Sequence, residues 1–177
     1  MRISSDFDEK TLEKLRVLYE ESFPEDEKKP FELLLQKRDE RLVELLAVFD
    51  ERDAFRALAI MALHGDIALL DYFAVVPQRR GMGIGGSALE ALKEIYSGQR
   101  IVLEIEDDEL PSEDATLRVM RKNFYLKHDM RFMPYKVNYF GVQMRVLTNG
   151  SDIDFDEYHE LYREVFGNEV SERISLV

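Results

Sequence analysis

Four of the nine glycines lie within six residues, Gly81–Gly86. They follow an apolar segment that ends at Val76 and precede a helical pattern that begins at Ser87. A glycine-rich turn between a strand and a helix leaves backbone N–H groups unpaired, and the helix dipole there favours an anion. Arg79 and Arg80 come directly before the turn and can pair with the same anion. The pattern predicts a phosphate-binding site; the simpler alternative is a tight turn that binds water.

Two carboxylates lie in otherwise apolar strand patterns and could act as a base. Asp71 lies within the apolar run 68–76, and Glu104 is flanked by apolar residues in the next strand pattern. Burying a carboxylate in a strand is costly unless it has a partner or a chemical task. We take Asp71 as the first candidate and Glu104 as the second. The structural alternatives are that Asp71 pairs with an arginine or a loop, and that Glu104 and Glu106 belong to a solvated strand face.

The elements that must position these residues follow from the hydrophobic periodicity. Apolar residues at helical spacing predict helices over 9–22, from Pro30 onward, and over 87–96, 115–127 and 155–166. Apolar runs bounded by turn residues predict strands over 42–49, 54–63, 67–76, 101–106, 132–136 and 139–147. The first three strands would form an antiparallel meander. Without repeats or linkers, the chain is expected to form one α+β domain over residues 1–177.

The composition excludes several classes of function. The 177 residues include 24 basic and 36 acidic side chains, for a net charge of −12, which argues against non-specific binding of nucleic acid. The absence of cysteine excludes disulfides, thiolate metal sites and a cysteine nucleophile. The three histidines show no ligand spacing, so no metal is expected. Because no apolar run could span a bilayer or form a signal core, we expect no membrane association and a cytoplasmic protein.

One interpretation of the glycine run is a dinucleotide fingerprint. Gly81, Gly83 and Gly86 fit the G-x-G-x-x-G spacing, and Glu106 lies twenty residues beyond, where an acid would bind a ribose. That motif belongs in the opening βαβ unit of a parallel sheet. Here an antiparallel hairpin comes first, and too little chain follows Glu106 to complete such a domain. The match is therefore weak.

A second interpretation begins from Gln78-Arg79-Arg80-Gly81-Met82-Gly83, which resembles the Q/R-x-x-G-x-G/A signature of the GNAT superfamily of N-acetyltransferases. The apolar segment 72–77 before it and Ile84-Gly85 after it agree with that context. Arg121-Lys122-Asn123-Phe124-Tyr125 resembles the family's second recurrent element, although Asp129-Met130 stand where Gly-Phe is common. The order of predicted elements from about residue 9 to 147 also fits.

The resemblance implies a GNAT-like α+β fold, with a mixed, mostly antiparallel sheet of about six or seven strands flanked by helices on both faces. The glycine loop would bind the pyrophosphate of acetyl-CoA. The strands 71–76 and 101–106 would part, and the pantetheine arm would lie in the gap. The residues that the resemblance implies for acetyl-CoA binding are Phe73, Ala74, Val75, Gln78, Arg79, Arg80, Gly81, Met82, Gly83, Ile84, Gly85, Gly86, Ser87 and Asn123.

The implied reaction is acetyl transfer to a primary amine, which is a small molecule, a polyamine or a protein amino group. Since the chain has no cysteine, the amine would attack acetyl-CoA directly in a ternary complex. In the family a tyrosine at the position of Tyr125 can protonate the leaving thiolate, and Asp71 or Glu104 would be the base. The segment 23–27, which ends in three acidic residues, lies where the family recognises its acceptor. A solvated loop explains this acidity equally well. The alternative function is a non-catalytic acyl-CoA-binding module, and exposed strand edges could pair two copies into a homodimer.

Overall fold

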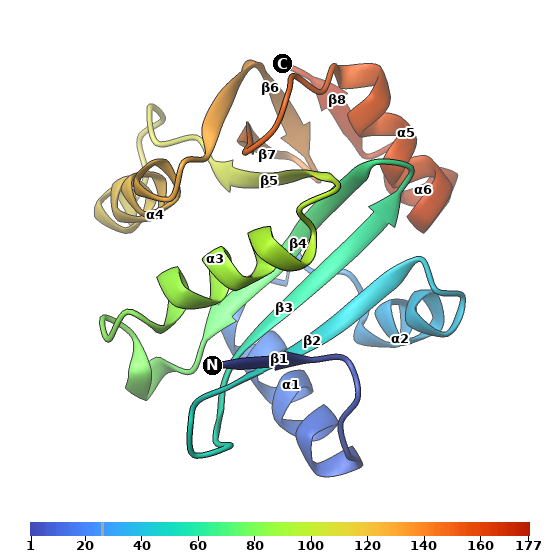
Figure 1. Ribbon diagram of the computed structural model, residues 1–177. Coiled ribbons are helices and arrows are strands. Elements are labelled where there is room, and N and C mark those ends of the chain that lie inside the picture. The colour runs from blue at the N-terminus through green and yellow to red at the C-terminus, as the bar shows by residue number, and fades with distance from the viewer. Residues whose placement is uncertain (26) are drawn as a thin grey trace.

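The computed structural model describes residues 1–25 and 27–177. One eight-stranded sheet runs through the centre of the molecule (Figure 1). In spatial order its strands are β1 (Arg2–Ser4), β2 (Val43–Phe49), β3 (Phe55–His64), β4 (Ile67–Val75), β5 (Arg100–Glu106), β7 (Val142–Thr148), β6 (Arg131–Tyr139) and β8 (Ile174–Leu176). Only β4 and β5 run parallel; every other neighbouring pair is antiparallel. The predicted mixed, mostly antiparallel sheet is confirmed.

The strand count exceeds the predicted six or seven because β1 and β8 are edge strands of three residues each. A segment that short is below the length at which alternation of apolar and polar residues can be recognised. Pairing with a longer neighbour forms each of them: Ile3 lies opposite Val48 of β2, and Ser175 lies opposite Asn138 of β6.

Helices cover both faces of the sheet, as predicted (Figure 1). One face carries α1 (Glu9–Ser22), α2 (Phe31–Asp39) and α5 (Phe155–Phe166), and the other carries α3 (Ile84–Ile95) and α4 (Ala115–Lys127). The short helices η1 (Pro77–Arg79) and α6 (Asn168–Ser171) complete the set in the described residues. Within residues 1–25 and 27–177, every helix is too short or too polar to cross a bilayer.

Two apolar cores lie on the two sides of the sheet. The larger core joins α1, α2 and α5. In α5 the buried residues recur at helical spacing: Tyr158, Leu161, Tyr162 and Val165. The smaller one joins α3 and α4 to the opposite side of β4 and β5. Tyr125 is the one buried residue of α4. The apolar contact of α4 with the rest of the protein is therefore small, and ion pairs between α4 and the segment before it add to that contact.

Candidate functional site

A bulge and a strand separation shape the centre of the sheet. In the β3–β4 ladder Ile60 lies opposite Tyr72 and Met61 opposite Leu70, which leaves Asp71 without a partner on β3. A bulge of this kind turns a side chain out of the regular alternation, and both Asp71 and Tyr72 consequently contact Lys29 on the α1–α2 side. The continuous apolar run around Asp71 hides this irregularity in the sequence.

The parallel strands β4 and β5 pair over only three positions, from Ile67–Arg100 to Leu69–Val102. Beyond them the two strands part, as the resemblance to the GNAT superfamily implies, and each continues with its other neighbour. The edge of β4 from Leu70 to Val75, which includes Phe73 and Ala74, therefore makes no ladder bonds with β5. We call this separation of β4 from β5 the slot; it lies between the carboxyl ends of two parallel strands, where ligands bind in many α/β proteins.

The glycine loop lies beside this slot and ends in the first turn of α3. The helix begins at Ile84, three residues before the predicted start at Ser87, because Gly83 caps it in the left-handed region with φ of +80°. Gly81 is also left-handed, with φ of +74°, and side chains are strained in this region. Within the described chain no backbone N–H from 81 to 86 has an acceptor. These N–H groups are the donors that an anion at a helix N-terminus would use.

Of the other residues implied for cofactor binding, Gln78, Arg79 and Arg80 precede the loop, Ser87 lies in the first turn of α3, and Asn123 lies on α4. Gln78, Arg79, Ser87 and Asn123 are exposed, and the Arg80 Nε donates to the Val75 carbonyl at 3.1 Å. An open cleft of about 420 Å³ adjoins the helix start; Met82, Gly83, Ile84 and Ser87 line it together with Met1, Asp50, Glu51 and Arg52. The loop is thus accessible and presents both amide donors and guanidinium groups to solvent.

Close packing of α3 against the end of α4 leaves no room for a side chain at Gly86. A Cβ at Gly86 would lie 2.8 Å from the Cε1 and Nε2 atoms of His128. The imidazole is held in place because its Nδ1 lies 2.8 Å from Glu90 Oε1 and its ring packs 4.9 Å from Phe124.

We expect Gly86→Ala to reduce the free energy of unfolding by about 1–3 kcal/mol because of this overlap. In a His128→Ala background the same substitution should become neutral or stabilising, because alanine favours a helix over glycine. Chemical denaturation of the four proteins in this cycle measures both effects. An equal loss in both backgrounds would contradict the steric explanation.

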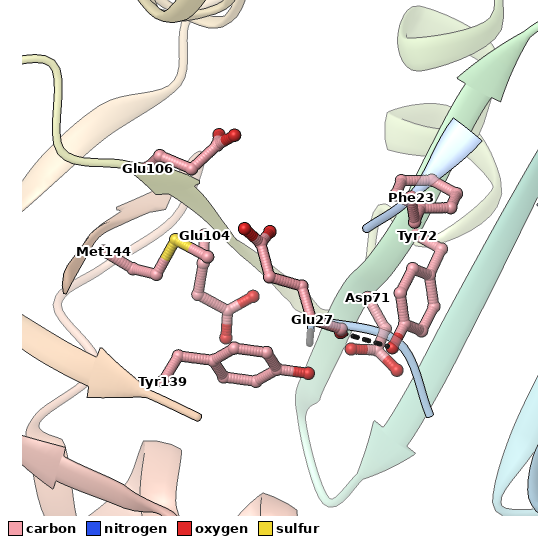
Figure 2. Close-up of a pocket in the computed structure, with 8 residues that line it drawn as sticks. All are labelled: Phe23, Glu27, Asp71, Tyr72, Glu104, Glu106, Tyr139 and Met144. Atoms are coloured by element: carbon pink, nitrogen blue, oxygen red, sulfur yellow. Dashed lines mark hydrogen bonds between the residues drawn. The ribbon is translucent and has the colours of Figure 1, made fainter. Parts of the chain in front are cut away.

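On the α1–α2 side, a small cavity of about 80 Å³ lies at the separation of β4 and β5. Figure 2 shows Asp71 and Glu104 pointing into the same space from neighbouring strands, with Glu106 further along β5. The remaining lining residues are Phe23, Glu27, Tyr72, Tyr139 and Met144. Phe23 and Glu27 belong to the acidic segment 23–27, of which Asp26 lies outside the described residues. Four carboxylates therefore line one cavity.

Asp71 is paired with a residue that the sequence did not indicate. Both of its oxygens accept from the Lys29 Nζ, at 2.8 and 2.9 Å, and the two side chains are almost completely buried. Burial raises the pKa of Asp71, and the Lys29 charge and hydrogen bond oppose that shift. The ammonium also donates to the Tyr139 hydroxyl at 2.8 Å and lies 4.5 Å from the centre of the Phe166 ring. The structural alternative for Asp71, an ion pair, is thus present, although the partner is a lysine and not an arginine.

Glu104 has hydrogen-bond donors but no cation in direct contact among the described residues. The hydroxyls of Tyr158 and Tyr162 both donate to its Oε1, at 2.5 and 2.7 Å. Burial raises the pKa of Glu104 to about 7, and the charge of Asp71 adds to the rise, while the tyrosine hydrogen bonds and Lys29 oppose it. A carboxylate with this pKa exchanges a proton near neutral pH. Periodicity alone assigned both tyrosines to the core.

Tyr125 lies on the other face of the sheet from Asp71 and Glu104. It packs in the smaller core, with its ring 5.0 Å from Phe124. Burial raises its pKa to about 12, and Glu104 adds to the rise while Arg121 opposes it. Tyr125 is therefore protonated at neutral pH. Glu106 forms an ion pair with Arg121, so the neighbouring carboxylate of β5 is matched by a cation.

Comparison with known proteins decides the family. The model of the acetyltransferase (GNAT) family matches residues 4–120, which is most of the chain. This chain belongs to the GNAT acetyltransferase family. Among curated proteins, none matches the sequence. The mixed sheet with its antiparallel meander also differs from the parallel sheet that a dinucleotide fingerprint requires. The glycine run is therefore not a dinucleotide fingerprint.

Solved structures share the GNAT fold with this acetyltransferase. One described as a GNAT-family acetyltransferase from Bacteroides thetaiotaomicron has a TM-score of 0.74 and 22% identity, and the match covers 95% of this chain and 99% of that one. A spermidine/spermine N-acetyltransferase from Vibrio cholerae has a TM-score of 0.62 at 11% identity, over 83% and 90% of the two chains. A GNAT acetyltransferase from Elizabethkingia anophelis with acetyl-CoA bound has a TM-score of 0.51 at 16% identity, over 68% and 90%.

Proposed function

We propose that this GNAT acetyltransferase transfers the acetyl group of acetyl-CoA to a small cationic primary amine by direct attack. The observation that carries the proposal is the cavity at the separation of β4 and β5, which four carboxylates line and which adjoins the slot. The unpaired amides at residues 81–86 fit the pyrophosphate, and the slot fits the pantetheine arm. Gln78, Arg79, Arg80 and Asn123 remain the proposed side-chain contacts of acetyl-CoA.

The acidic cavity favours an amine that arrives as an ammonium ion. Lys29 neutralises Asp71 and Arg121 neutralises Glu106, whereas Glu104 has only hydroxyl donors around it. An ammonium would therefore be attracted to Glu104. The cavity volume of about 80 Å³ admits the end of a narrow alkylamine but not a folded protein surface. The spermidine/spermine acetyltransferase with the same fold acts on amines of that kind.

Glu104 is the proposed base, ahead of Asp71. Both oxygens of Asp71 accept from Lys29, whereas Glu104 Oε2 accepts no hydrogen bond from the described residues. The Glu104 pKa of about 7 suits a group that must accept a proton from an ammonium at neutral pH. Asp71 then contributes by holding Lys29 and the segment before α2 against β4.

The proposed reaction uses one residue on each face of the sheet. Glu104 accepts the proton of the ammonium, and the amine nitrogen attacks the thioester carbonyl through the slot. The C–N bond forms and the C–S bond breaks, and Tyr125 donates its hydroxyl proton to the departing thiolate. Its pKa of about 12 keeps that proton in place until the thiolate forms. The nitrogen then loses its second proton, which restores the Tyr125 hydroxyl through solvent, and Glu104 releases the first proton to solvent. The net products are the amide, the CoA thiol and one proton.

Removing this proton donor gives a direct test of the Tyr125 role. We expect Tyr125→Phe to lower kcat by roughly 100-fold with little change in the KM for either substrate. Because Tyr125 titrates far above neutral pH, the fall of kcat toward low pH, which is the acidic limb of the pH profile, should keep its position. Steady-state kinetics between pH 6 and 9 measure both quantities. Full turnover in this variant would remove Tyr125 from the mechanism.

Calorimetry and a transfer assay together test the function. Acetyl-CoA should bind, and NADH should not. Gly83→Val, which strains a φ of +80°, should weaken the binding of acetyl-CoA. Release of the CoA thiol is then followed with diamines, amino alcohols and a peptide N-terminus as acceptors, and the diamines should react fastest. Binding of acetyl-CoA without transfer to any amine would favour the non-catalytic module.

A further inference from the structure

The C-terminal helix α5 contributes to the cavity although it lies beyond residues 4–120, where the family model matches. Its buried face packs on the larger core, and Tyr158 and Tyr162 lie one turn apart on that face. Their side chains are about 1% and 0% exposed, and their rings meet edge to face at 5.2 Å between centroids. Neither ring can turn away without opening the core.

Both hydroxyls converge on a single oxygen of Glu104. Tyr158 and Tyr162 each donate to Oε1, so neither bonds to Oε2. Two donors from one rigid helix fix the orientation of the carboxylate. The second oxygen stays available on the side of the cavity that Glu104 lines. Hydrogen bonds to a carboxylate also favour its charged form.

The other titratable groups around Glu104 do not provide this support by contact. They are Lys29 and Glu27 before α2, Asp71 on β4, Glu106 on β5, Tyr125 on α4, and Tyr135 and Tyr139 on β6. Lys29, which is the cation of this group, donates both to Asp71 and to Tyr139. The Tyr135 hydroxyl donates to the Ile153 carbonyl at 3.0 Å. Among the described residues, the two α5 tyrosines are thus the hydrogen-bond donors to Glu104.

We propose that Tyr158 and Tyr162 are positioning residues that hold Glu104 Oε1 and direct Oε2 toward the substrate amine. The catalytic effect of this positioning rests on the proposed function. The proposal makes α5 part of the active site and extends the site past the segment that identifies the family. The hydrogen bonds of the two tyrosines oppose the effect of burial and so lower the pH at which Glu104 becomes an effective proton acceptor.

Tyr158→Phe, Tyr162→Phe and the double variant test this proposal. Each loss of a hydrogen bond to the carboxylate should raise the Glu104 pKa by about one unit, and the double loss by about two. A raised pKa moves the acidic limb of the kcat profile to higher pH. Turnover at pH 7 should fall roughly fivefold for one hydroxyl and roughly 50-fold for both, and recover toward pH 9. Tyr135→Phe is the matched control, since its hydroxyl bonds elsewhere, and its profile should stay in place.

A second measurement does not depend on turnover. Infrared difference spectra across a pH titration of the substrate-free protein, with Glu104→Gln to assign the signal, report the carboxyl group directly. A shift in both measurements supports the proposal. A shift in the spectra without transfer by the wild type supports the tyrosine–Glu104 coupling and overturns the proposed function. Folded single variants, checked by circular dichroism, with unchanged spectra and profiles would overturn the proposal.

Discussion

Glu104→Gln is expected to lower acetyl transfer by at least about 100-fold and to stabilise the fold above neutral pH. The first effect is the loss of a general base, which contributes roughly 100- to 10,000-fold in enzymes. The second follows from burial. The pKa of the carboxyl is about 7 in the folded protein and has its ordinary value of 4.5 when exposed, so the folded state binds more protons between these values. Wild-type stability therefore falls as pH rises from 4.5 to 7.

The neutral amide removes this penalty while its oxygen can still accept from both tyrosines. The stability gained at pH 8 should be at most about 3 kcal/mol, and it should vanish near pH 4.5. Denaturation at both pH values and transfer kinetics measure the two effects. An equal gain at both pH values would mean that Glu104 is not the source of the pH dependence.

Asp71→Asn is the comparison that separates the two candidate bases. The negative charge of Asp71 raises the Glu104 pKa, so its removal should move the acidic limb of the rate profile to lower pH. In Glu104→Gln that limb should disappear. Retention of the limb in Glu104→Gln together with its loss in Asp71→Asn would assign the base to Asp71 instead.

The glycine loop and the order of elements could be predicted because they depend on local sequence. Positive φ at Gly83 and the unpaired amides beside it follow from glycine and from the geometry of a helix start. Glu104 could be predicted as a candidate because burying a carboxylate in an apolar strand is costly unless it has a partner or a chemical task. The parting of β4 from β5 came from the family resemblance, and the ladder shows it directly.

Long-range contacts account for what the sequence did not show. Lys29 and Asp71 are 42 positions apart, and no local pattern distinguishes a buried lysine in a loop from a solvated one. The helical spacing of Tyr158 and Tyr162 correctly indicated a buried face. It could not indicate that both hydroxyls reach β5, because that depends on how α5 crosses the sheet. The edge strands β1 and β8 exist only through their neighbours.

Lys29→Met is expected to destabilise the protein by about 3–5 kcal/mol at pH 7, because it leaves Asp71 buried without a cation. The side chains of Lys29 and Asp71 are 1% and 2% exposed, so bulk water screens the remaining charge of Asp71 only weakly. The backbone contacts of the same residue remain: its N–H donates to the Tyr72 hydroxyl at 2.9 Å, and its carbonyl accepts from Tyr19 at 2.7 Å. The loss therefore measures the buried charge rather than detachment of the segment before α2.

Two comparisons separate the charge from the packing in this prediction. Lowering the pH should reduce the deficit of Lys29→Met, because the unpaired Asp71 takes up a proton at a raised pKa and becomes neutral. The double variant Lys29→Met/Asp71→Leu should recover most of the stability, since an apolar pair replaces a buried ion pair among aromatic rings. Denaturation of the four proteins at pH 5 and pH 8 gives the coupling energy. Strictly additive losses would show that the two charges do not depend on each other, and Asp71 would then be available as a base.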